Sequence, residues 1–307
     1  MRRRGKPLSR VPDAGDVKGR LRKLTRRGAR VNIVSHNPTG SGPVRLAARL
    51  PRFVGAKGDV AAKLRAVRIG VAGCGSVGLN AAAHAARLQP AKIIVADPKA
   101  FKAESMLTHP ILAGAIGTPK AQYAADVCRQ ISPTTKIEAF VGRFEDLPLD
   151  VVADLDVCVM APDNLRAEVA IGQACMNLGV PLLQASVSGE MLVAQVRFWW
   201  FGRGGGDLVC PACKFSKEEF SQMSQEVRFR CGGPAPVGAE AQERAIPTMS
   251  VSFLCAMAAE LAMFQLLRFV AGLGTPVCNT ELEYCAYTHR TVVTPLRRRR
   301  DCPCDHT

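Results

Sequence analysis

The chain has 307 residues, 48% of them hydrophobic, which is enough to bury one large core or two domains. Its formal net charge is +15, but residues 1–30 alone hold 12 Lys/Arg against two Asp, so most of the excess belongs to the ends of the chain. The longest apolar segment, residues 251–267, is interrupted by polar residues, and the basic N-terminus lacks the apolar region of a secretory signal. These features exclude a membrane span and predict a cytoplasmic protein.

Residues 1–36 are predicted to be a basic, flexible N-terminal extension. We favour a solvated end without a partner. The alternative is a tail that touches nucleic acid, an acidic partner or a membrane surface. Residues 37–307 are predicted to form one domain, with its nucleotide-binding core at 66–200.

The segment at residues 68–97 has the pattern of a nucleotide-binding unit. Residues 68–72 read as a short buried strand, an Ala-rich stretch at 80–88 reads as a helix, and residues 93–95 read as a second buried strand. From here the chain alternates strands and helices, which predicts a Rossmann-like, doubly wound and mostly parallel sheet. Strands are expected at 68–72, 92–96, 136–140, 156–160, 181–185 and 192–198. Helices are expected at 44–66, with a break at Gly55, and at 78–88, 119–131, 164–178 and 248–271.

Three glycines and an acid carry the chemistry of this unit. Gly73 allows a tight turn, Gly75 lets the backbone approach a phosphate, and Gly78 lets helix and strand pack closely. The helix that follows offers free N–H groups and the positive end of its dipole to an anion. Asp97 lies 19 residues after Gly78, where a carboxylate can accept hydrogen bonds from ribose hydroxyls. Because a strand precedes the glycines and a helix, a second strand and an acid follow them, they predict a nucleotide site rather than an ordinary turn.

Further motifs follow in a fixed order and resemble a known family. After the glycines and Asp97 come residues 117–120 (GTPK), residues 162–164 (PDN) and residues 210–213 (CPAC). This order resembles the ThiF/MoeB/HesA adenylyltransferases, whose fold is shared with ubiquitin-activating enzymes. The stretch at 49–64 looks like the segment that precedes the first strand in that family, so the resemblance covers roughly residues 49–305.

The resemblance implies an enzyme that binds ATP and Mg²⁺ and adenylates the C-terminal carboxylate of a small ubiquitin-like or sulfur-carrier protein, with possible transfer of the acyl group to a cysteine. It also implies a homodimer and a conjugating or deconjugating enzyme as a further partner. The implied nucleotide-binding residues are Gly73, Gly75, Ser76, Gly78, Asp97, Lys120, Asp163 and Asn164, and the implied catalytic residues are Lys120, Asp163, Arg49 and Cys231.

Each implied role has a physical basis. Lys120 would neutralise phosphate charge, and Asp163 would carry magnesium. By the resemblance, Arg49 aligns with an arginine that reaches the phosphates of the neighbouring subunit in the family. Taken singly, Lys120 is also explained as an exposed lysine at a helix start, and Asp163 as an N-cap.

The chain departs from the family after Asp97. The family's Asn-Leu-x-Arg motif corresponds here to residues 105–108, with Ser105 at the asparagine position and Thr108 at the arginine position. Because that arginine contacts the triphosphate in the family, adenylation is expected to be weakened unless a nearby cation replaces it; the candidates are Lys99, Lys102 and Arg166. We expect His109 to be a plain turn histidine rather than a phosphate ligand.

The resemblance also assigns cysteines. It implies a structural zinc site held by Cys210, Cys213, Cys302 and Cys304, although the second pair is C-x-C rather than C-x-x-C. Cys231 lies in the region of the family's crossover loop, where Arg228 and Arg230 would favour a nucleophilic thiolate. Cys231 is explained equally well as a loop cysteine with no chemical role or as another zinc ligand.

Two rival functions stay open. The glycine fingerprint also serves NAD-dependent oxidoreductases, but no Tyr-x-x-x-Lys pair or other hydride-transfer constellation accompanies it. A degenerate, nucleotide-binding scaffold that presents a ubiquitin-like partner is the second rival, and Thr108 is its best support. Nucleic acid is not an expected partner, although the basic ends leave it open.

Overall fold

The structure is a computed structural model in which one compact unit, Leu50–Thr307, holds every described element. Residues 1–49 lie outside the described residues, and so does the predicted boundary between residues 36 and 37. The structure describes residues 53, 55–56, 58–163, 165–201, 209–215, 229–230, 233–234, 250–273, 278–300 and 302.

An eight-stranded sheet runs through the unit in the order β10-β9-β6-β5-β4-β1-β2-β3. Strands β1 to β5 are parallel, and β6, β9 and β10 extend one edge in antiparallel fashion. Because β1 lies between β2 and β4, the strand order reverses at β1, which is where open α/β sheets bind ligands. The strands are β1 Arg68–Ala72, β2 Lys92–Ala96, β3 Lys136–Phe140, β4 Val157–Met160, β5 Leu182–Ser188, β6 Val193–Trp199, β9 Thr280–Cys285 and β10 Arg290–Pro295, with a separate short pair, β7 Phe229–Arg230 and β8 Gly233–Pro234.

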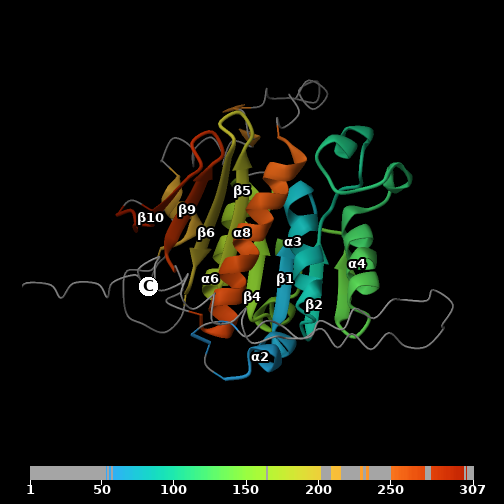
Figure 1. The fold of residues 1–307 in the computed structure, drawn as a ribbon, viewed down its shortest axis with the longest axis horizontal. Coiled ribbons are helices and arrows are strands. Elements are labelled where there is room, and N and C mark those ends of the chain that lie inside the picture. Colours follow the sequence, from blue (N-terminus) through green and yellow to red (C-terminus); the bar gives the residue numbers. More distant parts are fainter. Residues whose placement is uncertain are drawn as a thin grey trace, which may run out of the picture. The chain divides into compact units, whose positions relative to one another are not determined.

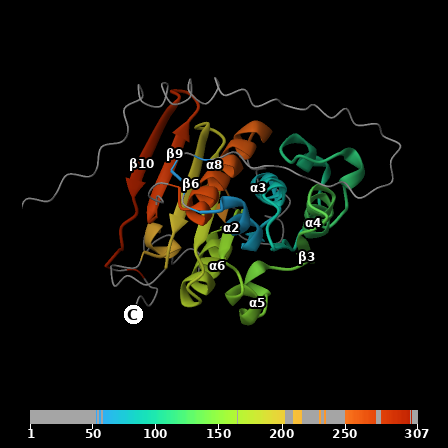
Figure 2. The same cartoon turned by 60° about the horizontal axis from the view of Figure 1, so that its bottom comes forward.

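Helices cover both faces of the sheet (Figures 1 and 2). One face carries α3, α4 and α8, and the other carries α5 and α6. The doubly wound α/β fold predicted from the sequence is therefore confirmed. The helices are α2 Val60–Ala66, α3 Ser76–Arg87, α4 Lys120–Ile131, α5 Leu149–Ala153, α6 Leu165–Asn177 and α8 Ser252–Ala271, and short 3₁₀ turns are η1 Ala103–Leu107, η2 Ala113–Ala115, η3 Phe144–Asp146 and η4 Pro211–Lys214.

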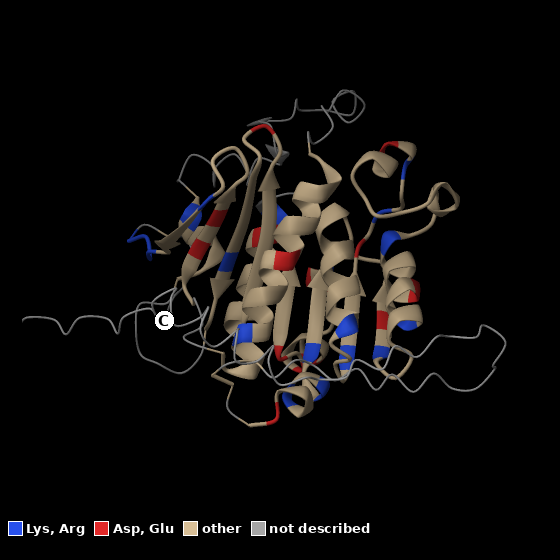
Figure 3. Cartoon of the chain, viewed as in Figure 1, with Lys and Arg blue, Asp and Glu red and all other residues tan. Residues whose placement is uncertain are grey.

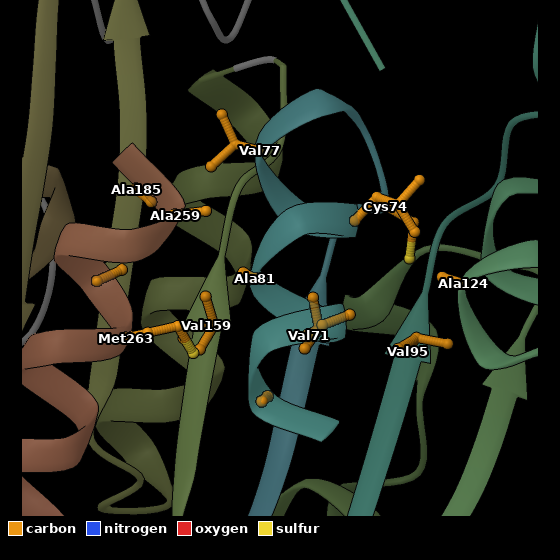
Figure 4. Close-up of a cluster of buried hydrophobic side chains, with 14 of the residues drawn as sticks. Val71, Cys74, Val77, Ala81, Val95, Ala124, Val159, Ala185, Ala259 and Met263 are labelled. Atoms are coloured by element: carbon orange, nitrogen blue, oxygen red, sulfur yellow. The ribbon is translucent and has the colours of Figure 1, made fainter. Parts of the chain in front are cut away.

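Small residues let α3 and α8 approach each other and the sheet. Ala81 of α3 and Ala259 of α8 are fully buried, together with β-branched residues of the sheet such as Val71 and Val159 (Figure 4). Alternate residues of each strand point to opposite faces, so these valines fill one core while their neighbours fill the other. An Ala-rich helix loses little side-chain entropy when it packs this closely.

Helix α8 is the one helix in the described part of the chain that is long and apolar enough to cross a membrane by length and composition. It packs against α3, β5 and β6, and its buried residues include Leu254 and Leu266. Glu260 and Arg268 are its only charged residues (Figure 3). This packing is that of the central helix of a folded domain.

The predicted elements agree well with the structure. All six predicted strands are present within three residues at each end, and so are the helices α3, α4, α6 and, within four residues, α8. The helix predicted at 44–66 is confined to 60–66 in the described residues, because Gly55 and Gly58 adopt left-handed conformations, with φ of +84° and +74°. The short helix α5 was not predicted.

The close packing of α3 on the turn that precedes it depends on the missing side chain of Gly78. A Cβ atom at Gly78 would lie far inside van der Waals contact with the backbone oxygen of Gly73. We expect Gly78→Ala to lower the free energy of unfolding by about 1–3 kcal/mol, since backbone cannot move aside cheaply. Urea denaturation measures this. Gly114→Ala is the matched control, because a Cβ atom there meets nothing within 4 Å, and an equal loss in both variants would contradict the explanation.

Candidate functional site

The glycine turn lies at the carboxyl end of β1, at the upper edge of the sheet in Figure 1. Gly73 has a φ of +89°, and a Cβ atom there would lie 2.7 Å from the backbone oxygen of Ala161, after β4. Gly75 is different, since a Cβ atom at this position would meet only Nε2 of His109, at 3.8 Å. Helix α3 begins directly after Gly75 with no side-chain cap. The turn therefore leaves room beside Gly75 and free N–H groups at the helix start.

Asp97 follows β2 and fixes this turn from the side. Its side chain is buried, and its Oδ2 accepts a hydrogen bond of 2.7 Å from the backbone N–H of Cys74, while Oδ1 accepts one of 2.8 Å from the N–H of Lys99. Each carboxylate oxygen can accept more than one hydrogen bond. The acid predicted to hold a ribose is thus oriented by backbone N–H groups of the glycine turn and of the loop that follows β2.

Lys120 reaches the same edge because the chain doubles back before α4. The N–H of Lys120 donates to the carbonyl of Lys99 at 2.9 Å, and the N–H of Phe101 donates to the carbonyl of Thr118 at 3.0 Å. The ammonium then lies 5.6 Å from the centroid of the Phe101 ring. Burial lowers the pKa of Lys120, and Lys99 lowers it as well, whereas Asp97 and Asp163 oppose this.

His109 faces Lys120 across the site. Its Nε2 lies 3.4 Å from Nζ of Lys120, and its Nδ1 lies 2.9 Å from Oγ1 of Thr108. An ammonium can only donate, so Nε2 is the acceptor, and Nδ1–H donates to Thr108. Burial, followed by the Lys120 charge, lowers the pKa of His109 to about 4. From the sequence His109 was expected to be a plain turn histidine, and its spacing of 11 residues from Lys120 gave no sign of this contact.

Asp163 follows β4, the neighbour of β1, and completes the edge. Its side chain is 62% exposed and forms an ion pair with Lys99. Lys99 is one of the cations proposed as a replacement for the family's arginine. Lys102 instead pairs with Glu104, and Arg166 is exposed at the start of α6.

The structure brings the glycine turn, Asp97, Lys120 and Asp163 to one edge of the sheet, at the carboxyl ends of β1, β2 and β4. Lys99 links them, because its backbone binds Asp97 and its side chain binds Asp163. Several predicted residues lie outside the described residues; these are Arg49, Asn164, Arg228, Cys231 and Cys304.

Three predicted zinc ligands gather at a second place. The thiols of Cys210, Cys213 and Cys302 lie within 4.8 Å of one another. The sulfur of Cys210 is 3.8 Å from that of Cys213 and 3.6 Å from that of Cys302. A cavity of about 350 Å³ adjoins Cys210 and Cys213 and is lined by residues at the ends of β6 and β10, among them Trp199 and Pro295. These cysteines could hold a metal ion.

A mostly parallel sheet with a glycine turn and a buried acid at its switch point is typical of nucleotide-binding α/β proteins. The model of the ThiF family matches residues 46–305, and the chain therefore belongs to the ThiF family.

Curated relatives share this region. The adenylyltransferase and sulfurtransferase MOCS3 of Mus musculus is 27% identical over 256 residues, which cover 81% of this chain and 49% of that protein. MOCS3 of Arabidopsis thaliana is 24% identical over 60% of this chain and 35% of that protein. The SAMP-activating enzyme E1 of Haloferax volcanii is 27% identical over 41% of this chain and 47% of that protein. The chain thus spans between a third and a half of the length of these relatives.

Solved structures share the fold. The crystal structure of E. coli MccB with ATP superposes with a TM-score of 0.59 at 14% identity, covering 80% of this chain and 67% of that chain. PaaA superposes with a TM-score of 0.60, also at 14% identity, covering 78% of this chain and 75% of that chain.

The low pKa of His109 predicts a pH-dependent stability. The unfolded chain protonates this imidazole near its ordinary pKa of 6.5, whereas the folded protein protonates it only near about 4. The unfolded state therefore binds more protons between these values, and stability is lost as the pH falls through this window.

We expect the free energy of unfolding of the free protein to fall more steeply between pH 6.5 and pH 4 than that of His109→Gln. The expected difference is on the order of 1 kcal/mol, discounted for the partial exposure of the ring. Urea denaturation at a series of pH values measures both slopes. Equal slopes would show that His109 titrates normally in the folded protein.

Proposed function

We propose that the protein uses ATP to adenylate the C-terminal carboxylate of a small ubiquitin-like or sulfur-carrier protein. The observation that carries the proposal is the shared edge, where a glycine turn, a buried acid, two lysines and an exposed carboxylate follow three adjacent strands. The names of the relatives, adenylyltransferases and an activating enzyme, support the reaction class.

The residues of this edge fit the parts of a nucleotide. Asp97 has the buried, oriented carboxylate that ribose hydroxyls require, and the open space at Gly75 lies beside the unpaired N–H groups of α3, where a phosphate binds well. In the reaction, a carboxylate oxygen of the carrier bonds to the α-phosphorus while the bond from that phosphorus to the bridging oxygen breaks. The products are an acyl adenylate and pyrophosphate. Lys120 stabilises the negative charge on the departing pyrophosphate.

Asp163 fits a magnesium site. Its carboxylate is a hard oxygen ligand and is exposed at the end of β4. Bound Mg²⁺ supplies charge neutralisation of the triphosphate. Lys99, which now neutralises Asp163, is placed to turn its ammonium to the phosphates when the carboxylate takes another cation. In this proposal Lys99 takes over part of the work of the arginine that Thr108 replaces.

The cysteine cluster fits zinc. In a tetrahedral site with Zn–S bonds near 2.3 Å, neighbouring sulfurs lie about 3.8 Å apart, and the two measured separations are 3.8 and 3.6 Å. Cys304 is proposed as the fourth ligand. All described cysteines are free thiols, which agrees with the proposed cytoplasmic location. Homodimerisation, with Arg49 serving the neighbouring subunit, and thioester formation at Cys231 are parts of the proposal that rest on the family resemblance.

A nucleotide-binding scaffold is the second candidate, and the observation in its favour is Thr108 at the arginine position. The exchange of labelled pyrophosphate into ATP, in the presence of a carrier ending in Gly-Gly, separates the two. Exchange identifies an enzyme, whereas nucleotide binding without exchange identifies a scaffold.

We expect Asp163→Asn to lower the rate of this exchange about 100-fold, because the triphosphate loses its metal ligand in the transition state. Asp126→Asn is the matched control, since Asp126 lies on the exposed side of α4 and pairs with Arg129. Exchange that survives unchanged in Asp163→Asn would remove Asp163 from the mechanism.

We expect the purified protein to contain one zinc ion per chain and Cys210→Ser to lose it. Since structural zinc contributes directly to folding, the variant's Tm should fall by about 5 °C or more. Elemental analysis and thermal denaturation provide the two measurements. Cys285→Ser should keep the metal, because Cys285 lies on β9 away from the cluster. A wild-type protein without stoichiometric zinc would refute the proposal.

A further inference from the structure

We propose that His109 is a phosphate-binding residue of this site and that it acts in its protonated form. Together with Lys120 and the backbone at Gly75 it forms the subsite for the outer phosphates of ATP. The inference rests on the proposed function, because it assigns a residue to the triphosphate.

The first support is the position of the imidazole over the glycine turn. A Cβ atom built at Gly75 would have a single neighbour within 4 Å, Nε2 of His109 at 3.8 Å. The open space that Gly75 leaves is therefore bounded by this nitrogen. An anion that rests on the N–H groups at the start of α3 would face it directly.

The second support is the pairing of two basic groups. Nε2 of His109 lies 3.4 Å from the ammonium of Lys120. Within the described part of the chain, no carboxylate lies within ion-pair distance of that ammonium, although Asp97 and Asp163 act on it from further away. An anionic oxygen bound near both nitrogens would give each a partner of opposite charge.

The third support is that Thr108, which replaces the arginine of the family motif, holds this imidazole. The N–H of His109 donates to the carbonyl of Ser105 at 2.8 Å, and Nδ1–H donates to Oγ1 of Thr108 at 2.9 Å. Ser105 is itself buried, and its hydroxyl accepts the N–H of Lys102 at 3.1 Å. The Phe101 ring packs against the imidazole at a centroid distance of 5.5 Å. Thr108 thus positions His109 at the place where an arginine is missing, and Ser105 holds the backbone of the same turn.

The charges around His109 explain when it becomes protonated. Lys120 on α4 is the charged group that faces it, and Lys99, Asp97 and Asp163 face Lys120 in turn. In the free protein, burial and Lys120 oppose protonation. One negative charge about 4 Å away would favour the imidazolium roughly a thousandfold, which is enough to reverse this. Binding of the triphosphate then takes up one proton from solvent, and release of pyrophosphate returns it.

The test is calorimetric titration of the full chain with Mg²⁺ and a non-hydrolysable ATP analogue between pH 6 and pH 8. Two buffers with different ionisation enthalpies give the number of protons taken up. We expect the wild type to take up more protons than His109→Gln and to lose affinity more steeply as the pH rises. At pH 6 the variant should bind about tenfold more weakly, the effect of losing one charge-assisted hydrogen bond.

Two controls separate the contribution of the outer phosphates from the rest of nucleotide binding. Wild type and His109→Gln should bind AMP equally well, because AMP lacks those phosphates. His84→Gln should behave as wild type, since His84 lies on α3 beside Glu260 and away from the site. Proton uptake that comes from the nucleotide itself is the same for both proteins, so it cancels in the difference between the wild type and His109→Gln.

NMR of the histidine ring protons gives a direct reading in the wild-type protein, with the His109 signals assigned by their loss in His109→Gln. We expect this imidazole to be neutral at pH 6 in the free protein and protonated in the complex. If the protein binds the ATP analogue but His109 stays neutral and the variant matches the wild type, this inference is overturned and the proposed function stands. A protein that binds NAD in place of ATP would overturn both.

Discussion

The hydrogen bond from the backbone N–H of Cys74 to the carboxylate of Asp97 joins the turn after β1 to the end of β2. A buried carboxylate is costly unless its oxygens are bonded, so the turn and the acid stabilise each other. The second oxygen binds the N–H of Lys99, which sets the direction in which the chain leaves β2. The carbonyl of Lys99 then receives the N–H of Lys120. One buried acid thus arranges the turn, the loop and the start of α4.

The same edge collects groups that the free protein does not stabilise. Lys120 and His109 are basic side chains removed from water, and they lie against each other instead of against acids. Such an arrangement lowers the free energy of unfolding and is typical of a binding site for a ligand of opposite charge. Lys99 and Asp163 form the opposite case, because each already has a partner of opposite charge in the free protein.

The cysteine cluster is connected to this edge through α6. Lys214, directly after Cys213, pairs with Glu168, and its Nζ also lies 3.4 Å from Oε1 of Gln184 on β5. Glu168 lies in the first turn of α6, five residues after Asp163. A buried pair of this kind requires its full set of partners, and removal of one leaves an uncompensated charge. A metal bound by the cysteines would therefore also hold α6, which begins two residues after Asp163.

The sequence by itself determined the doubly wound sheet and the glycine turn, because alternating apolar strands, Ala-rich helices and glycine spacing are local properties of the chain. The distance from the glycine turn also pointed to Asp97, whereas Lys120 and Asp163 were implied only by the resemblance of their motifs to the family. It gave no reason to pair Lys120 with His109 or Lys99 with Asp163. Those contacts depend on how the segment between β2 and α4 folds back over the turn, and on which strands are neighbours. Only the tertiary structure decides them, because the charge and the pKa of a side chain depend on what surrounds it in space rather than on what precedes it in the chain.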